Sequence, residues 1–242
     1  VLHFTVSPQH QEEFTGLYKQ KKREYEERFG IRFDVSFSLQ KPSTDTIAVI
    51  FTNEPFRNED GSILFRPGGH GALIHNLNEL DADIIFIKNI DNVVPEKHIK
   101  PTIHYKKVLA GKLIELQSKV FSLLGELENK TPEGRRLKEI FSIIQDEFCY
   151  EPQEEPDFTD TKKTQQILYD LLHRPIRVCG VVRNLGEPGG GPFWAPNGKG
   201  DITLQIIESS QIDTTNANQR EIFSHATHFN PVYLVCAPKD HK

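Results

Sequence analysis

Methionine is absent from the 242-residue sequence, tryptophan occurs once, and the three cysteines stand far apart. An odd number of widely spaced cysteines argues against a disulfide framework and favours free thiols in a reducing compartment. A metal site built from them is the alternative. The three are Cys149, Cys179 and Cys236.

Long apolar runs and an excess of positive charge are also missing. No stretch reaches the roughly 18 apolar residues that a membrane-spanning helix needs. The first residues, VLHFTVSPQH, lack the basic and apolar regions of a signal peptide, so we expect a cytoplasmic protein. The net charge of −5 argues against nucleic acid or an anionic membrane surface as the main partner. Small phosphate ligands remain compatible, because backbone N–H groups can hold them on an acidic protein.

The first residues also suggest an incomplete chain. Position 1 is valine, and the sequence begins inside an expected strand. We therefore expect that the natural N-terminus is missing. The lack of methionine also raises the question of whether modified methionines have been left out.

Apolar runs alternate with turn residues along the first 90 positions. Ser at an N-cap followed by Pro is a strong helix start, and glycine at position 30 is a typical helix end. This alternation favours an α/β domain with a largely parallel sheet. Strands are expected at Leu2–Val6, Ile31–Leu39, Ile47–Phe51 and Asp83–Ile90, and helices at Ser7–Phe29 and Ala72–Leu80.

Residues 102–173 are expected to be mostly helical and to form an insertion in a single domain spanning residues 1–242. The helical segments are about Thr102–Leu127, Pro132–Phe148 and Asp160–His173. Strands then return at Pro175–Val182, Ile202–Ile207 and Pro231–Cys236, with a Gly/Pro-rich loop between Asn184 and Gly200.

A glycine-rich segment precedes the short helix expected at Ala72–Leu80. Glycines allow a ligand to approach the backbone, and free N–H groups at a helix start favour an anion. The segment therefore predicts a nucleotide-binding loop, although a tight turn around a hydrogen-bonded histidine is the alternative. Its residues are Gly68, Gly69, His70 and Gly71.

A second polar segment, Lys88–Asn92, follows the apolar run Asp83–Ile87. Ligands of open α/β sheets bind beyond the carboxyl ends of strands, and Mg²⁺ prefers carboxylate oxygens and substrate phosphates. Asp91 is therefore a candidate magnesium ligand and catalytic residue. A turn that ends the strand is the alternative. We expect this segment and the glycine-rich loop to share one rim of the sheet.

The stretch GGHGALIHNLNELDADIIFIKNIDNVV resembles the paired signature of UDP-sugar pyrophosphorylases: a Gly-Gly-His-Gly-type loop, a helix, and a strand ending in Asn-x-Asp-Asn. The whole chain is more similar to an uncharacterised bacterial domain-of-unknown-function family of the Bacteroides type. That similarity runs through HFTVS within Val1–Ser7, QKPSTDTIAV at Gln40–Val49, RNLGEPGGGPFW at Arg183–Trp194 and THFNPV at Thr227–Val232.

The resemblance implies a GT-A-like, Rossmann-like fold with a mostly parallel sheet flanked by helices. It implies that Gly69 and His70 lie near uracil and phosphate and that Asp91 binds metal. The segment beginning at Ile202 is similar to a strand whose first glutamate binds the sugar, which implies this role for Glu208. His228 and Asn230 match a following Asn-His-Phe segment less closely, since threonine replaces its asparagine. Gln211 stands at the second acidic position of the motif.

The Gly/Pro-rich loop also holds candidate site residues. The backbone at Gly190 would follow the surface of a ligand, and the Trp194 ring would contact it. A surface hairpin with a packed tryptophan is the alternative. Arg183 would supply a cation for phosphate. Lys41 is a similar candidate, with a catalytic role.

The expected reaction is transfer of a uridylyl group from UTP to a sugar 1-phosphate, with Mg²⁺ and release of pyrophosphate. The pyrophosphorylases carry an early Leu-x-x-Gly-x-Gly-Thr-Arg-type loop that does not occur in this sequence. A non-catalytic nucleotide-sugar binding protein is therefore one alternative. A GT-A glycosyltransferase is another, although Asn89 replaces the first acid of its Asp-x-Asp pair. An α/β protein without a small-ligand site is the third.

Overall fold

The computed structural model describes residues 1–186 and 189–242, and of His70 and Asp91 it describes only the backbone. The chain divides into two compact units, Val1–Asp81 and Ala82–Lys242.

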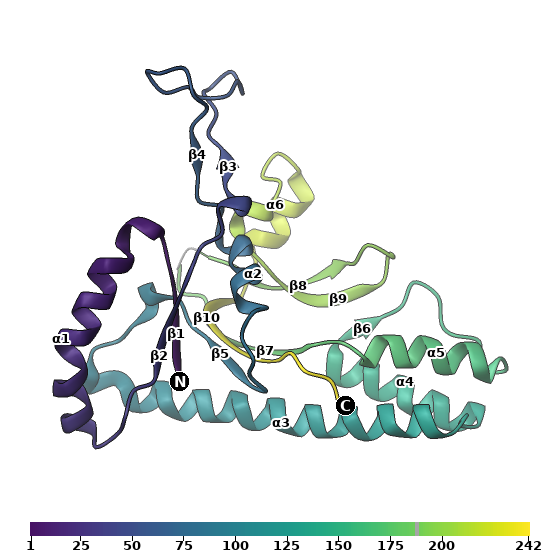
Figure 1. The fold of residues 1–242 in the computed structure, drawn as a ribbon. Helices are drawn as coiled ribbons and strands as arrows, with labels where there is room; N and C mark the ends of the chain where they lie inside the picture. Colours follow the sequence, from purple (N-terminus) through teal and green to yellow (C-terminus); the bar gives the residue numbers. More distant parts are fainter. Residues whose placement is uncertain (187–188) are drawn as a thin grey trace. The chain divides into compact units, whose positions relative to one another are not determined.

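The first unit begins with a strand–helix–strand arrangement. β1 (Leu2–Val6) pairs in parallel with β2 (Val35–Leu39), and α1 (Gln11–Phe29) connects them (Figure 1). The helix ends at Gly30, whose φ of 63° lies in the left-handed region that favours glycine. The expected strand, helix and helix end are confirmed here, although the second strand is shorter than expected.

The rest of the first unit is a narrow ribbon followed by two short helical turns. β3 (Thr46–Ile47) pairs antiparallel with β4 (Phe65–Arg66), and the ribbon projects away from β1 and β2 (Figure 1). A 3-10 turn, η3 (His70–Leu73), then leads into α2 (Ile74–Leu77). The observed strand shares only Ile47 with the strand expected at 47–51, and the helix expected at 72–80 is shorter in the structure.

Three helices dominate the second unit. α3 (Ile99–Asn129) is the longest, and α4 (Gly134–Phe148) and α5 (Thr161–Leu172) lie along its C-terminal half (Figure 1). All three were expected, with slightly different bounds. Apolar residues recur every three or four positions along α3, which produces one buried stripe. Its buried members are Leu113, Leu116, Val120, Leu123, Leu124 and Leu127.

Two small antiparallel sheets complete this unit. In the first, β10 (His228–Ala237) lies between β5 (Ile85–Ile87) and β7 (Ile176–Arg183). Val235 and Ala237 of β10 join the buried core of the three helices. The second sheet has the order β6 (Tyr150–Glu151), β9 (Ile202–Ile207) and β8 (Gly191–Pro196).

The expected GT-A-like, mostly parallel sheet is wrong. β5 pairs antiparallel with β10, and β1–β2 is the one parallel pair among the strands of the described residues. An apolar, β-branched run such as Ile84–Ile87 fits a central parallel strand and an edge strand equally well, and here it forms an edge. The helices at residues 99–172 supply most of the buried core, which the sequence interpretation had assigned to a parallel sheet.

Several elements were not expected from the sequence, among them the two-residue strands β4 and β6. β8 lies inside the loop assigned to residues 184–200, where glycines and prolines hide the alternation of a strand. α6 (Ala217–Ser224) is a short helix whose N-terminus is capped by the Asn216 side chain, which accepts from two backbone N–H groups. Phe193 of β8 contacts Phe223 of α6 with ring centroids 6.1 Å apart.

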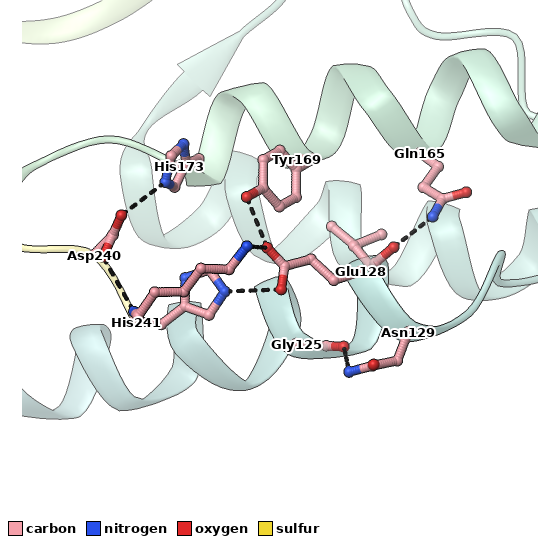
Figure 2. Close-up of polar contacts among 10 residues, drawn as sticks. Gly125, Glu128, Asn129, Gln165, Tyr169, His173, Asp240 and His241 are labelled. Carbon is pink, nitrogen blue, oxygen red and sulfur yellow. Dashed lines mark hydrogen bonds and ion pairs between the residues drawn. The ribbon is translucent and has the colours of Figure 1, made fainter.

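The last residues of the chain are tied to the helices. The Glu128 carboxylate of α3 accepts a hydrogen bond from Tyr169 of α5 at 2.8 Å and pairs with Lys242 and His241 (Figure 2). These donors lower the pKa of Glu128 to about 2. Of the helices within the described residues, none is both long enough and apolar enough to cross a membrane.

Adjacent residues of α3 offer a test of where the core lies. Leu113 is fully buried, whereas Ile114 is 52% exposed. Leu113→Ala should lower the free energy of unfolding by about 2–5 kcal/mol, because it removes buried methyl groups and leaves a cavity. Ile114→Ala should change it by roughly 1 kcal/mol or less, since the side chain already contacts water. Urea denaturation followed by circular dichroism measures both, and equal losses would contradict this core.

Candidate functional site

The predicted nucleotide-binding loop lies in the first unit. The Gln40 side chain donates to the Gly68 carbonyl oxygen at 3.0 Å. A Cβ atom at Gly68 would stand 2.5 Å from the Thr44 carbonyl oxygen, so glycine is required there by close packing. Gly69 is the residue before η3, and around Gly69 and Gly71 a Cβ atom would meet nothing within 4 Å.

Other groups near this loop bind within the first unit. The Lys41 ammonium pairs with the Glu79 carboxylate, on the exposed surface. Asn76 of α2 is buried and donates to the Leu39 carbonyl oxygen at 2.8 Å. Because η3 and α2 span four residues each, the aligned N–H groups expected at the start of a longer helix are few. The His70 side chain lies outside the described residues.

The predicted magnesium segment lies in the second unit, immediately after β5. Its backbone forms a 3-10 turn at Ile90–Asn92, with Asn89 at the preceding position. The Asn92 side chain donates to Asn89 Oδ1 at 2.9 Å and to the Pro231 carbonyl oxygen at 2.8 Å. The turn, called the Asn89–Asn92 turn below, is therefore fixed to β10. The Asp91 side chain is outside the described part of the chain.

β10 carries a bulge at the point where the Asn89–Asn92 turn meets it. Phe229 pairs with Val182 and Tyr233 pairs with Gly180, so residues 230–232 lie opposite Val181 alone. Val232 has a φ of 56°, which is unfavourable for a β-branched residue. Such strain persists only where surrounding contacts hold the backbone, and it concentrates at functional sites.

Asn230 supplies the contacts that hold this bulge. It is buried, and its side chain donates to the Gly180 carbonyl oxygen at 2.6 Å and accepts from Val232 N–H at 3.1 Å. Its own backbone N–H donates to the Gly190 carbonyl oxygen at 2.8 Å. Asn230 therefore joins β7, β10 and the residue preceding β8, which explains its burial.

Gly190 in turn lies against Glu208. A Cβ atom at position 190 would stand 2.8 Å from the Glu208 carboxyl carbon, so glycine admits the carboxylate at this point. Glu208 and Gln211 form a capping box, in which Gln211 accepts from Glu208 N–H at 2.9 Å. The glutamine at the second acidic position of the motif thus serves to hold the turn that carries Glu208.

The remaining predicted residues lie on neighbouring strands. His228 pairs in register with Arg183 across β10 and β7, and its Nδ1 is 2.9 Å from the Thr227 hydroxyl. Trp194 lies on β8 with 54% of its surface exposed, which leaves its ring accessible. Glu187 and Pro188 of the same loop lie outside the described residues.

Within the second unit, the structure brings several of the predicted residues together. Gly190 lies against Glu208 and accepts a hydrogen bond from Asn230, and Asn92 joins the Asn89–Asn92 turn to the same bulge. His228 lies two residues before Asn230 on β10. Gly68–Gly71 and Lys41 belong to the first unit. β4 pairs with β3 and β5 pairs with β10, so the two strands expected to share one rim are in different sheets.

A basic cluster beside the Asn89–Asn92 turn was missed from the sequence. Lys88 donates to the Tyr233 hydroxyl at 2.8 Å, and Lys106 of α3 lies 5.8 Å from the Tyr233 ring centroid. Burial, and then the charge of Lys88, lower the pKa of Lys106. Burial would raise the pKa of Tyr233, but hydrogen bonds from Lys88 and Thr102 and the charges of both lysines outweigh it and leave that pKa below its ordinary value.

No sequence spacing joins these residues, because they come from three elements far apart in the chain. Lys88 follows β5, Lys106 lies in the second turn of α3, and Tyr233 lies on β10. The sequence does contain lysines near the predicted magnesium segment. Lysines on a helix are typical of any solvated helix face, so they do not by themselves indicate a binding site.

The Asn89–Asn92 turn offers oxygen ligands of the kind that Mg²⁺ prefers, namely amide, carbonyl and carboxylate groups. Among the described side chains there is no group of three or more His, Cys, Asp or Glu residues that could hold a metal ion. The donor chemistry at Asn89, Asp91 and Asn92 fits Mg²⁺ if phosphate oxygens and water complete its coordination.

The C-terminal cluster of Figure 2 also holds residues that often bind metals or protons. His173 and Asp240 are 3.4 Å apart, and the His241 ring lies 6.3 Å from that of His173. The carboxylates here already pair with Lys242, Tyr169 and the histidines. This cluster is therefore a structural tie between the chain's last residues and the helices.

Comparison with curated proteins and with solved structures gives no significant match. A family model described as a domain of unknown function, DUF4301, matches residues 1–242, the full length of the chain. The chain therefore belongs to the DUF4301 family.

Proposed function

We propose that the protein binds a nucleotide and a sugar phosphate at the bulge of β10 and transfers a uridylyl group from UTP to the sugar 1-phosphate. One observation carries the proposal. Hydrogen bonds run from Asn92 to Pro231 and from Asn230 to Gly190, and Gly190 lies against Glu208. Segments that are remote in sequence, each matched to a different part of the substrate, thus meet at one place.

The roles within the site divide according to chemistry. The Asn89–Asn92 turn supplies hard oxygen ligands near the phosphates, and Glu208 offers a carboxylate that accepts hydrogen bonds from sugar hydroxyls. Trp194 is exposed enough to contact a sugar or base. The buried Asn230 has its side chain engaged with Gly180 and Val232, which supports a positioning role rather than direct sugar binding.

The proposed reaction needs little acid–base chemistry from the protein. A phosphate oxygen of the sugar 1-phosphate is already ionised at neutral pH and attacks the α-phosphorus of UTP, and the bond to pyrophosphate breaks. Rate acceleration then comes from positioning the two substrates and from offsetting charge on the transferred group. Mg²⁺, when bound, would supply part of that charge stabilisation.

Non-catalytic binding of a nucleotide or nucleotide sugar is the second candidate. It is favoured by the Asn89–Asn92 turn, where the Asn92 side chain donates to Asn89 Oδ1 and to the Pro231 carbonyl oxygen of β10, so these groups already have partners within the protein. The antiparallel sheets give the transfer reaction no support from fold, so both candidates rest on the residues at the bulge.

Ligand binding and turnover distinguish these candidates. UTP, UDP-glucose or UDP-N-acetylglucosamine at one hundred times its Kd should stabilise the protein by about 2.7 kcal/mol, detected as a higher melting temperature. The transfer reaction also predicts release of pyrophosphate from UTP and a sugar 1-phosphate in the presence of Mg²⁺. Stabilisation without release would favour the binding protein, and no stabilisation by any of the three ligands would contradict both.

Asp91→Asn tests the proposed metal role. The substitution keeps the size of the side chain and removes its charge, so pyrophosphate release should fall by about 100-fold or more while the melting temperature stays unchanged. Asp83→Asn is the matched control before β5, because Asp83 is an exposed residue paired with Lys239. Equal activity of the Asp91 variant and the control would remove Asp91 from the mechanism.

Gly190→Ala tests the position of Glu208. The new methyl group would meet the carboxylate within 3 Å and displace it, so KM for the sugar 1-phosphate should rise while KM for UTP changes little. Gly198→Ala, in the turn between β8 and β9, is the control, because a Cβ atom there meets nothing within 4 Å. A KM for the sugar that stays constant in both variants would argue against Glu208 as a sugar ligand.

A further inference from the structure

We propose that Lys88, Lys106 and Tyr233 form a binding site for the phosphate groups of an anionic ligand. The three side chains converge from the end of β5, the second turn of α3 and the strand β10. None of them was matched to a substrate group by the resemblance to pyrophosphorylases.

The geometry places the two ammonium groups on one aromatic residue. Lys88 Nζ lies 2.8 Å from the Tyr233 hydroxyl oxygen and 4.6 Å from the ring centroid, and Lys106 Nζ lies 5.8 Å from that centroid. A hydrogen bond from the Thr102 side chain also reaches Tyr233. The ring fixes both lysines through cation–π contacts, which leaves their remaining N–H donors available to a ligand.

Lys88 and Lys106 carry like charges beside one aromatic ring. Within the described residues, neither Lys88 nor Lys106 has a carboxylate within ion-pair distance, whereas other lysines of the second unit do, such as Lys112 and Lys119 with Glu147. Lys106 is half-buried and repelled by Lys88. Two like charges held close together in half-buried positions repel each other, and an anion bound beside both of them offsets that repulsion.

Several features favour phosphate over other anions. Phosphate presents multiple charged oxygens, and the cluster has two ammonium groups beside the first two turns of α3, where the helix dipole is positive. The protein carries a net charge of −5, so this is a local site for a small anion rather than part of a broad basic surface.

The cluster lies beside the turn where the phosphates of the proposed substrates bind. The Tyr233 hydroxyl donates to the Asn92 carbonyl oxygen at 3.5 Å, so the cluster adjoins the Asn89–Asn92 turn. Phosphates bound at that turn could extend onto the lysines. The choice of pyrophosphate as the ligand rests on the proposed function. The site itself rests on the two ammonium groups that lie beside the Tyr233 ring.

The test is calorimetric titration of the full chain with inorganic pyrophosphate in EDTA, so that no divalent metal contributes. Wild-type protein should bind, and Lys106→Ala and Lys88→Ala should each weaken binding about tenfold or more, because each removes a charge-assisted contact. Lys107→Ala is the matched control, since it removes the same charge from the adjacent, exposed position of α3. That control should bind within about twofold of wild type, as expected for a screened surface charge.

A loss of affinity through misfolding is separated by two further measurements. Circular dichroism should show unchanged helix content, and Lys106→Arg should restore most of the binding because it retains the charge. The proposal is overturned if wild-type protein does not bind pyrophosphate, or if Lys107→Ala loses as much affinity as Lys106→Ala. Lysine-dependent binding without UDP-sugar formation would contradict the proposed function alone, and UDP-sugar formation that is indifferent to both lysines would contradict this site alone.

Discussion

The side chain of Asn230 is the interaction on which the rest of the candidate site depends. It donates to the Gly180 carbonyl oxygen and accepts from the Val232 N–H, inside a bulge where residues 230–232 lie opposite Val181 alone. An unpaired buried polar group costs about 1–3 kcal/mol, so these bonds offset much of the strain at Val232. The Asn89–Asn92 turn and Gly190 are attached to the same three residues of β10. Removal of this one amide would therefore loosen the turn and the residue beside Glu208 together.

Local features of the chain were predictable because they depend on neighbouring residues. The helix ending at Gly30, the three long helices and the Asp160 cap of α5 follow from capping residues and from apolar spacing. The sheet order was not predictable in this way, because an apolar strand such as β5 carries no mark of which partner it pairs with. Its pairing with β10 joins residues more than 140 positions apart. β8 was not predicted, because its glycines and prolines are unusual in a strand and its stability comes from pairing with β9.

The candidate site shows the same division. Glu208, His228 and Asn230 were predicted by resemblance, and Gly190 was predicted from its glycine-rich loop. Gly190 contacts both Glu208 and Asn230, but the buried position of Asn230 supports a different role from the one expected. Lys88, Lys106 and Tyr233 were not predicted. The sequence does not show whether a lysine is paired with a carboxylate, and a paired lysine is a weaker candidate for binding a ligand. Gln211 stands where the resemblance would place an acidic residue. Its side chain accepts a hydrogen bond from the Glu208 N–H, which gives this glutamine a structural role in the turn.

The bulge also limits which changes the chain tolerates in length. Residues 230–232 stand opposite one residue of β7, so β10 carries an even number of extra residues, and its side chains keep the same faces before and after the bulge. Loss of a single residue there would turn everything beyond it to the opposite face. Val235, now 1% exposed, would point away from the helices, and Tyr233 would leave Lys106. The number of residues in this short segment therefore sets both the packing of Val235 in the core and the position of Tyr233 beside the lysines.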